Sequence, residues 1–247
     1  MSDAPSDSTR AAVLRGPHEV AEDEARGPVV GLYARLRELL GVPFVPTVFR
    51  MLALHEDYLA AVVDAASTVP VERLAASARR GVELAAGVAR QLEPSAVSAG
   101  GDTAAVQALL ARYNVANPAG MLIVVALSDG LGPARVMQAP LPERASRSLL
   151  DDVLLCHGGF TVPGLWRELA DGWPEVAERA WSEIRSLARD PRFAAGRDAL
   201  VALASEAAPA GTFPRAVDHP GAGEIVAWFA RGIPTMVLEI ECLRLAL

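Results

Sequence analysis

The sequence predicts an all-α protein built from two related helical repeats, with a cavity between them. Of its 247 residues, 51% are hydrophobic and only 5% are aromatic, and alanine and leucine dominate the apolar set. Both residues lose little rotamer freedom in a helix, which favours helix over sheet. One apolar motif occurs a second time in the other half of the chain, which indicates an internal duplication.

The duplicated motif begins at residues 42–46 with the sequence Val-Pro-Phe-Val-Pro and continues to residue 59. A degraded copy occupies residues 160–176, where Pro163 corresponds to Pro46, 117 positions earlier. Proline drives the residue before it out of the α region, so an extended turn should precede each following helix. We expect Thr47 to cap the first of these helices.

The first half of the chain is expected to contain one tail and one repeat. Residues 1–27 are polar and acidic and predict a mobile tail, and the first repeat follows over 28–131. Apolar residues recur at helical spacing over 28–40, and Gly41 should end that helix. A helix of small residues is expected over 71–92. The Asn117-Pro118 step should end a helix that begins near residue 103 and start another over 119–127.

The second half is expected to repeat this order over residues 143–247, after a Gly- and Pro-rich linker at 132–142. Helices are expected over 143–157, 173–190 and 192–207. In the last segment, Ile233-Pro234 takes the place of Asn117-Pro118. Ligand sites favour the interfaces between repeats and domains, so we expect a pocket where the halves meet.

Composition excludes several classes of function. All 23 basic residues are arginine, which rules out Schiff-base chemistry, a lysine nucleophile and a P-loop. The net charge of −7 and the lack of a clustered basic face argue against nucleic acid. No apolar run reaches the length of about 18 residues that a membrane span needs. The start does not resemble a signal peptide, so a cytoplasmic location is expected.

Metal binding is also not expected. The two cysteines, Cys156 and Cys242, stand far apart in the sequence and cannot build a zinc site without further ligands. We expect both to be reduced thiols. His157 follows Cys156 directly, and adjacent helical residues point in different directions, so a thiol–imidazole pair is geometrically poor. We expect His157 to stabilise the end of a helix instead.

Two carboxylates stand in the apolar run near the end of the chain. Glu239 and Glu241 lie about 200° apart around a helix, so at least one of them should be buried. Glu241 has Arg244 at i+3, a common pairing, whereas Glu239 has no basic residue at i+3 or i+4. A buried glutamate can act as a general base. We therefore expect Glu239 to face the cavity between the repeats.

Several other residues allow two interpretations. Asn117 precedes a proline and is expected either to cap a helix or to bind a ligand. The aromatic residues of the two motifs could line an apolar cavity, although aromatic residues at helical spacing more often form ordinary core. These residues are Phe44, Phe49, Trp166 and Trp173.

Together the two motifs, the block Tyr-Asn-Val-Ala-Asn-Pro at 113–118 and the loop Phe-Pro-Arg at 213–215 resemble the group I 2-haloacid dehalogenases, the DehI family. The resemblance covers nearly the whole chain from about Val29. It implies an all-α protein of two repeats with the active site between them, often dimeric and needing no metal or cofactor. Members of the family displace halide from an α-halo acid by direct attack of an activated water.

The resemblance also implies which residues form the site. Asn117 matches the family asparagine that helps to hold water and substrate. The family's catalytic aspartate belongs to a Ser-Asp-Tyr triplet, and that place reads Gly164-Leu165-Trp166 here. Leucine cannot take a proton from water, and a carboxylate base typically contributes about 10²–10⁴-fold. The pocket is therefore expected to persist without water activation.

In such a protein the nucleophile would belong to the substrate, for instance an amine that closes a ring onto a carbon bearing halide or sulfate. We expect Glu239 to accept the proton, and three arginines are candidates to hold an anionic leaving group: Arg50, Arg167 and Arg215. Substrate contacts are also expected from Phe44, Thr47 and Trp166.

Two other functions remain open from the sequence. The protein could be a hydrolytic 2-haloacid dehalogenase with a relocated base, or a non-catalytic paralogue that pairs with an active subunit or binds a small carboxylate. In each case the expected ligand is a small carboxylate or another anion. A homodimer or a heterodimer with a paralogous subunit is expected.

Overall fold

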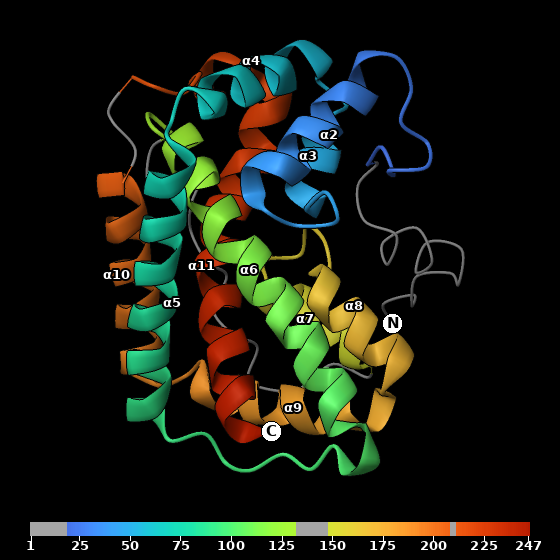
Figure 1. The fold of residues 1–247 in the computed structure, drawn as a ribbon. Coiled ribbons are helices and arrows are strands. Elements are labelled where there is room, and N and C mark those ends of the chain that lie inside the picture. Colours follow the sequence, from blue (N-terminus) through green and yellow to red (C-terminus); the bar gives the residue numbers. More distant parts are fainter. Residues whose placement is uncertain (1–18, 132–147, 208–210) are drawn as a thin grey trace, which may run out of the picture.

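Helices α6 and α11, the two longest of the fold, pack against each other through the middle of the molecule (Figure 1). The computed structural model describes residues 19–131, 148–207 and 211–247. These residues form ten α-helices and two short 3₁₀ helices, and no strand occurs among them. The predicted all-α class is confirmed. The expected tail up to residue 18 and the expected linker at 132–142 lie outside the described residues.

The same order of helices occurs twice along the chain. The first series is α2 (Pro28–Leu40), α3 (Thr47–Leu52), α4 (Glu56–Ser67), α5 (Val71–Leu92), η1 (Gly100–Asp102) and α6 (Thr103–Leu127). The second is α7 (Leu149–Cys156), α8 (Gly164–Gly172), α9 (Pro174–Leu187), α10 (Pro191–Ala207), η3 (Ala216–Asp218) and α11 (Pro220–Ala246). The expected helix from residue 143 therefore begins only at Leu149 among the described residues.

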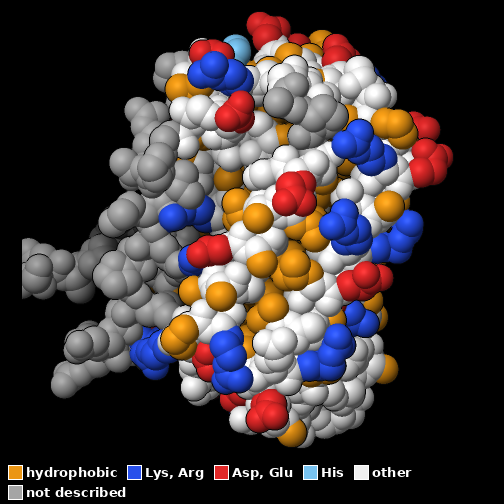
Figure 2. All heavy atoms as spheres, turned by 90° about the vertical axis from the view of Figure 1, so that its left-hand side faces the viewer, with side chains coloured by type: hydrophobic (Ala, Val, Ile, Leu, Met, Phe, Trp, Pro, Cys, Tyr) orange, Lys and Arg blue, Asp and Glu red, His pale blue; other side chains and the backbone are white. Residues whose placement is uncertain are grey.

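The short helices of the two series cover opposite ends of the central pair. In Figure 1, α2, α3 and α4 lie at the top, whereas α7, α8 and α9 lie at the bottom. Helices α5 and α10 pack side by side along one flank. Figure 2 shows the face on this flank, where charged side chains of both signs are interspersed with hydrophobic ones.

The two proline turns have nearly the same backbone geometry. Pro46 precedes α3 with φ −57° and ψ 145°, and Pro163 precedes α8 with φ −57° and ψ 142°. The expected extended turns are therefore present, with the prolines rather than Thr47 at the N-cap positions. Gly41 ends α2 in the left-handed conformation, with φ 65°, and its N–H donates to the carbonyls of Arg37 and Glu38.

The expected break at Asn117-Pro118 is wrong, because α6 runs continuously through Pro118. A proline inside a helix removes one backbone hydrogen bond, here to the carbonyl of Asn114. From Pro118 to Val125 every residue of α6 is buried, and packing outweighs the loss of a single bond. Pro234 lies inside α11 in the same way.

Helix α6 is also the part of the described chain that is long and apolar enough to cross a membrane. More than half of its apolar stretch is buried against the rest of the protein. A core helix of a folded domain has this same composition, because it is covered on every side. In this fold α6 serves as such a core helix.

Candidate functional site

Two cavities of similar size lie on either side of Trp228 in α11. The first, which we name the motif cavity, has a volume of about 460 Å³ and is lined by both proline motifs together with α6, α8 and α11. The second, the α7–α11 cavity, has a volume of about 440 Å³ and is lined by residues 156–160 and one face of α11. Trp228 and Gly232 line both. Both volumes fall in the range typical of small-molecule sites.

Five of the eight sequence-predicted site residues line the motif cavity. They come from the first motif, from α6 and from α8: Phe44, Thr47, Arg50, Asn117 and Arg167. The residues before α3 and those before α8 are more than a hundred positions apart in the chain, and the fold brings them to one cavity. The expectation that the two motifs face a shared pocket agrees with this geometry.

Asn117 does not cap a helix, because it lies in the interior of α6. Its amide nitrogen Nδ2 is buried and has no hydrogen-bond partner. A buried donor without a partner costs about 1–3 kcal/mol. Since this side chain lines the motif cavity, a ligand there could accept the missing hydrogen bond.

The arginines of the motif cavity differ in how far they are neutralised. Arg50 donates from Nη2 to Thr47 Oγ1 (3.1 Å) and lies 3.3 Å from Glu19 Oε1. The side chain of Arg167 forms no ion pair within 4 Å and no hydrogen bond within the part of the chain that the structure describes, and only its main-chain N–H donates, to the carbonyl of Pro163 (3.2 Å). Its positive charge is therefore available to an anion in the cavity.

The sequence analysis missed a cluster of polar residues on the same wall. Arg112 pairs with Glu168, and the Tyr113 hydroxyl donates to Glu168 Oε1 (2.6 Å). Burial and the neighbouring Glu168 raise the pKa of Tyr113, which therefore stays protonated. Asp171 lies one turn beyond Glu168 on α8 and also lines the cavity. The i, i+3 spacing of these two acids within the second motif was a usable signal.

Three predicted site residues do not line either cavity. Trp166 is fully buried, and its Nε1–H donates to Glu239 Oε2 (3.0 Å). Glu239 is only 2% exposed, so it is buried as expected, but it lies behind Trp166 rather than in the motif cavity. Arg215 stands in the loop before η3, with its guanidinium against Gly130 and 4.0 Å from Asp218. The expected direct contacts of these three residues with a substrate therefore do not fit the motif cavity.

Glu239 finds its partner in His157, which belongs to a distant part of the sequence. His157 is the C-cap residue of α7, as expected, and its Nε2 lies 3.1 Å from Glu239 Oε1. The contact is an ion pair rather than a well-aligned hydrogen bond. Burial alone would lower the pKa of His157, but the facing Glu239 carboxylate and the Val153 carbonyl outweigh burial and raise it.

A second buried charge network lies next to this pair. Asp152 accepts a hydrogen bond from Trp181 Nε1 (2.7 Å) and lies 2.9 Å from Arg185 Nε. The Trp181 ring packs edge-on against Trp166, with 4.9 Å between the ring centroids. The two networks therefore join α7, α8, α9 and α11 into one buried polar layer beneath the cavities.

No group of three histidine, cysteine or acidic residues within the described ranges could hold a metal ion. Cys156 and Cys242 are both buried and free. Burial raises the pKa of Cys156 to about 11 and that of Cys242 to about 12. Both cysteines are therefore neutral thiols near neutral pH and poor nucleophiles.

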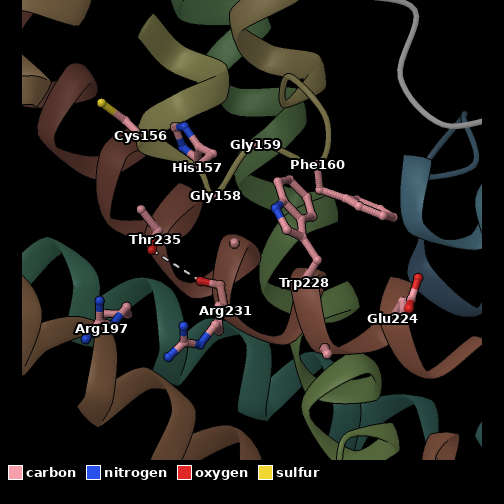
Figure 3. A pocket seen from close by; sticks show the side chains of 12 residues that line it. Cys156, His157, Gly158, Gly159, Phe160, Arg197, Glu224, Trp228, Arg231 and Thr235 are labelled. Carbon is pink, nitrogen blue, oxygen red and sulfur yellow. Dashed lines mark hydrogen bonds between the residues drawn. The ribbon is translucent and has the colours of Figure 1, made fainter. Parts of the chain in front are cut away.

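Figure 3 shows the α7–α11 cavity from close by. Arg197 and Arg231 lie on one side of it, and the rings of Phe160 and Trp228 lie on another. The Thr235 hydroxyl donates to the main-chain carbonyl of Arg231 (3.2 Å). None of the residues predicted as a site from sequence lines this cavity.

No protein-family model matches this sequence, and a comparison with curated proteins finds no match. Solved structures of D-2-haloacid dehalogenases do match the fold. A mutant D-2-haloacid dehalogenase has a TM-score of 0.75 and 15% identity, with 94% of this chain and 97% of that chain covered.

The D-2-haloacid dehalogenase complex with L-LA gives a TM-score of 0.75 at 16% identity, again over 94% of this chain and 97% of that one. A mutant complex with D-2-CPA gives 0.74 at 16% identity, over 95% of this chain and 97% of that one. At this level of identity the similarity concerns the fold, and the chain has the haloacid dehalogenase-like fold.

Proposed function

We propose that the motif cavity binds a small organic acid and promotes displacement of its leaving group, halide or sulfate, by a nucleophile carried on the same substrate. The observation that carries this proposal is the pairing of an unpartnered buried donor, Asn117 Nδ2, with an uncompensated cation, Arg167, in one cavity. The fold shared with D-2-haloacid dehalogenases supports the same class of chemistry.

Arg167 would hold the substrate carboxylate, because a guanidinium donates two parallel N–H bonds to a carboxylate. Asn117 Nδ2 would donate to the leaving group or to a second oxygen. Phe44 and Met236 supply apolar walls that exclude water. The charge of Arg50 is partly neutralised by Glu19, 3.3 Å away, and Arg50 is placed to stabilise a departing anion. Positioning and desolvation of this kind accelerate an intramolecular displacement.

In the proposed step the substrate amine attacks the carbon that bears the leaving group. A carbon–nitrogen bond forms while the bond to the leaving group breaks, and the leaving group departs with its electron pair. The proton released by the nitrogen passes to Asp171, which lines the cavity and is exposed to solvent. Glu239 is not suited to accept it, since its carboxylate is buried, does not line the motif cavity and is already held by Trp166 and His157.

Leu165 stands at the position that corresponds to the catalytic aspartate of the 2-haloacid dehalogenase family, and this supports a nucleophile carried on the substrate. Leu165 is fully buried and does not line the motif cavity. A hydrolytic dehalogenase with a relocated base is the second candidate, because Glu168 and Asp171 do line the cavity and could activate water. A chain that binds the acid without turnover, as a partner subunit in a homodimer or heterodimer, is the third.

Chloride release from two substrates separates these candidates. We expect chloride from 5-amino-2-chloropentanoate above the uncatalysed rate, because its amine can close a five-membered ring, and no release from 2-chloropropionate.

Asn117→Ala should reduce kcat/KM at least about tenfold, since hydrogen bonds to charged groups contribute about 1.5–3 kcal/mol. Arg215→Gln, outside the cavity, should leave it unchanged. Release from 2-chloropropionate that Asp171→Asn abolishes would show hydrolysis instead, and binding without release from either substrate would show a binding protein.

A further inference from the structure

The α7–α11 cavity contains three buried donor atoms that lack a hydrogen-bond partner. They are Nε and Nη1 of Arg231 and Nε1 of Trp228. Native proteins pair nearly all of their buried polar atoms, through protein groups or ordered water. Three such donors around one cavity therefore indicate that something else occupies it.

Arg231 carries the positive charge of this cavity. Burial and the nearby Arg197 both lower its pKa, and Asp198 opposes them. Arg197 is neutralised by Asp198, at 2.8 Å, and His157 faces Glu239. Glu224 also lines the cavity, but Figure 3 places it on the far side of Trp228. The Arg231 guanidinium thus has no carboxylate partner among the described residues.

The opposite wall is aromatic. The rings of Trp228 and Phe160 pack with 5.6 Å between their centroids. The indole Nε1 of Trp228 lies at the Gly158 edge of the cavity, where an added Cβ would stand 3.3 Å from it. Gly158 has φ +88°, a conformation that favours glycine, so this edge remains open to a ligand.

This arrangement is separate from the motif cavity, although Trp228 and Gly232 line both. Arg231 lines only the α7–α11 cavity, whereas Arg167 and Asn117 line only the motif cavity. Each cavity therefore has its own cation and its own unpartnered donor. Occupancy of one can be tested without disturbing the charged group of the other.

We propose that the α7–α11 cavity is a second ligand site, which binds a small organic carboxylate with an apolar body. The carboxylate would accept hydrogen bonds from the Arg231 guanidinium, whose Nε and Nη1 have no partner among the described residues, and the apolar body would pack on Phe160 and Trp228. The Trp228 indole would donate to a further polar atom of the ligand. A guanidinium pairs with carboxylates and with phosphates, but the aromatic wall of Phe160 and Trp228 favours an anion with an apolar body over inorganic phosphate or sulfate.

Benzoate is a suitable probe, because it combines one carboxylate with an apolar ring. We expect benzoate to bind with measurable heat and to shift the indole N–H resonance of Trp228, identified by its loss in Trp228→Phe. Arg231→Gln should weaken binding at least tenfold, and Arg231→Lys, which keeps the charge but loses the planar fork, should weaken it less. Arg167→Gln, which alters only the motif cavity, should leave benzoate binding unchanged.

Two results would overturn the proposal. One is equal binding of benzoate and inorganic sulfate, which would reveal a non-selective anion site. The other is benzoate binding that Arg167→Gln abolishes and Arg231→Gln leaves intact, because the benzoate would then occupy the motif cavity. Neither result bears on chloride release from halo acids, so failure here is distinguishable from failure of the proposed function.

Discussion

Replacing Glu239 by glutamine should remove the contribution that the Glu239–His157 pair makes to the pH dependence of the protein's stability. Glutamine keeps an oxygen that can accept the Trp166 N–H, but it removes the charge that faces His157 at 3.1 Å. Removing one partner of a buried ion pair typically costs about 3–5 kcal/mol. Here the imidazole can lose its proton instead, so the lower end, about 3 kcal/mol, is expected at pH 6.

The sign of the pH dependence follows from the raised pKa of folded His157. An unfolded histidine has a pKa of about 6.5. The pair therefore stabilises the wild-type protein fully below that pH, and the contribution is lost as pH rises through the higher pKa of the folded state. At pH 9 the Glu239→Gln variant should differ from wild type by only about 1 kcal/mol, the value of one altered hydrogen bond.

Urea unfolding followed by tryptophan fluorescence at pH 6 and pH 9 measures this difference. Glu241→Gln is the matched control on the same helix, because Glu241 pairs with Arg244 (2.7 Å) and accepts from Asn114 (2.7 Å), so it faces no histidine. Its cost should be the same at both pH values. An equal loss at pH 6 and pH 9 for Glu239→Gln would show that the protonation of His157 does not change between these pH values and would refute the reasoning.

Four further predictions concern three buried groups and one exposed ion pair. Asn117→Ala should weaken binding of 2-chloropropionate about tenfold or more without lowering the urea midpoint, since its donor has no partner to lose. Arg231→Met should raise the free energy of unfolding by about 1 kcal/mol, because it removes buried unpaired donors, and a lower urea midpoint would contradict this. Asp152→Ala should cost about 3–5 kcal/mol, because it removes the buried carboxylate that faces Arg185 and accepts from Trp181. Glu175→Ala, in an exposed i, i+4 pair, should cost at most about 0.5 kcal/mol in the same unfolding assay.

Local sequence signals predicted most of the helices correctly. The proline before each motif helix, Gly41 at the end of α2 and Pro191 at the start of α10 all act within a few residues, so their effect can be recognised without the fold. The prediction failed at Pro118, where the local cost of a proline competes with the burial of half a helix. Tertiary packing keeps the chain helical at Pro118, and a window of local sequence does not show that packing.

The candidate site was only partly predictable for a related reason. Burial of Glu239 followed from helical periodicity, but its partner His157 comes from another helix, 82 positions earlier in the sequence. The pairing of the two motifs indicated the first cavity. A signal for the second was also present, since Arg231 interrupts an otherwise apolar stretch of α11, yet only the fold shows that its Nε and Nη1 have no hydrogen-bond partner among the described residues.

The buried polar atoms that lack a hydrogen-bond partner indicate where the function of this chain lies. Of the described buried polar atoms without a hydrogen-bond partner, those of Arg50 and Asn117 line the motif cavity, and those of Trp228 and Arg231 line the α7–α11 cavity. Of the others, two face carboxylates, and Asn114 uses its amide nitrogen for another bond. Apolar replacements at such positions are often neutral or stabilising. Their concentration around the two cavities is therefore better explained by ligands than by stability.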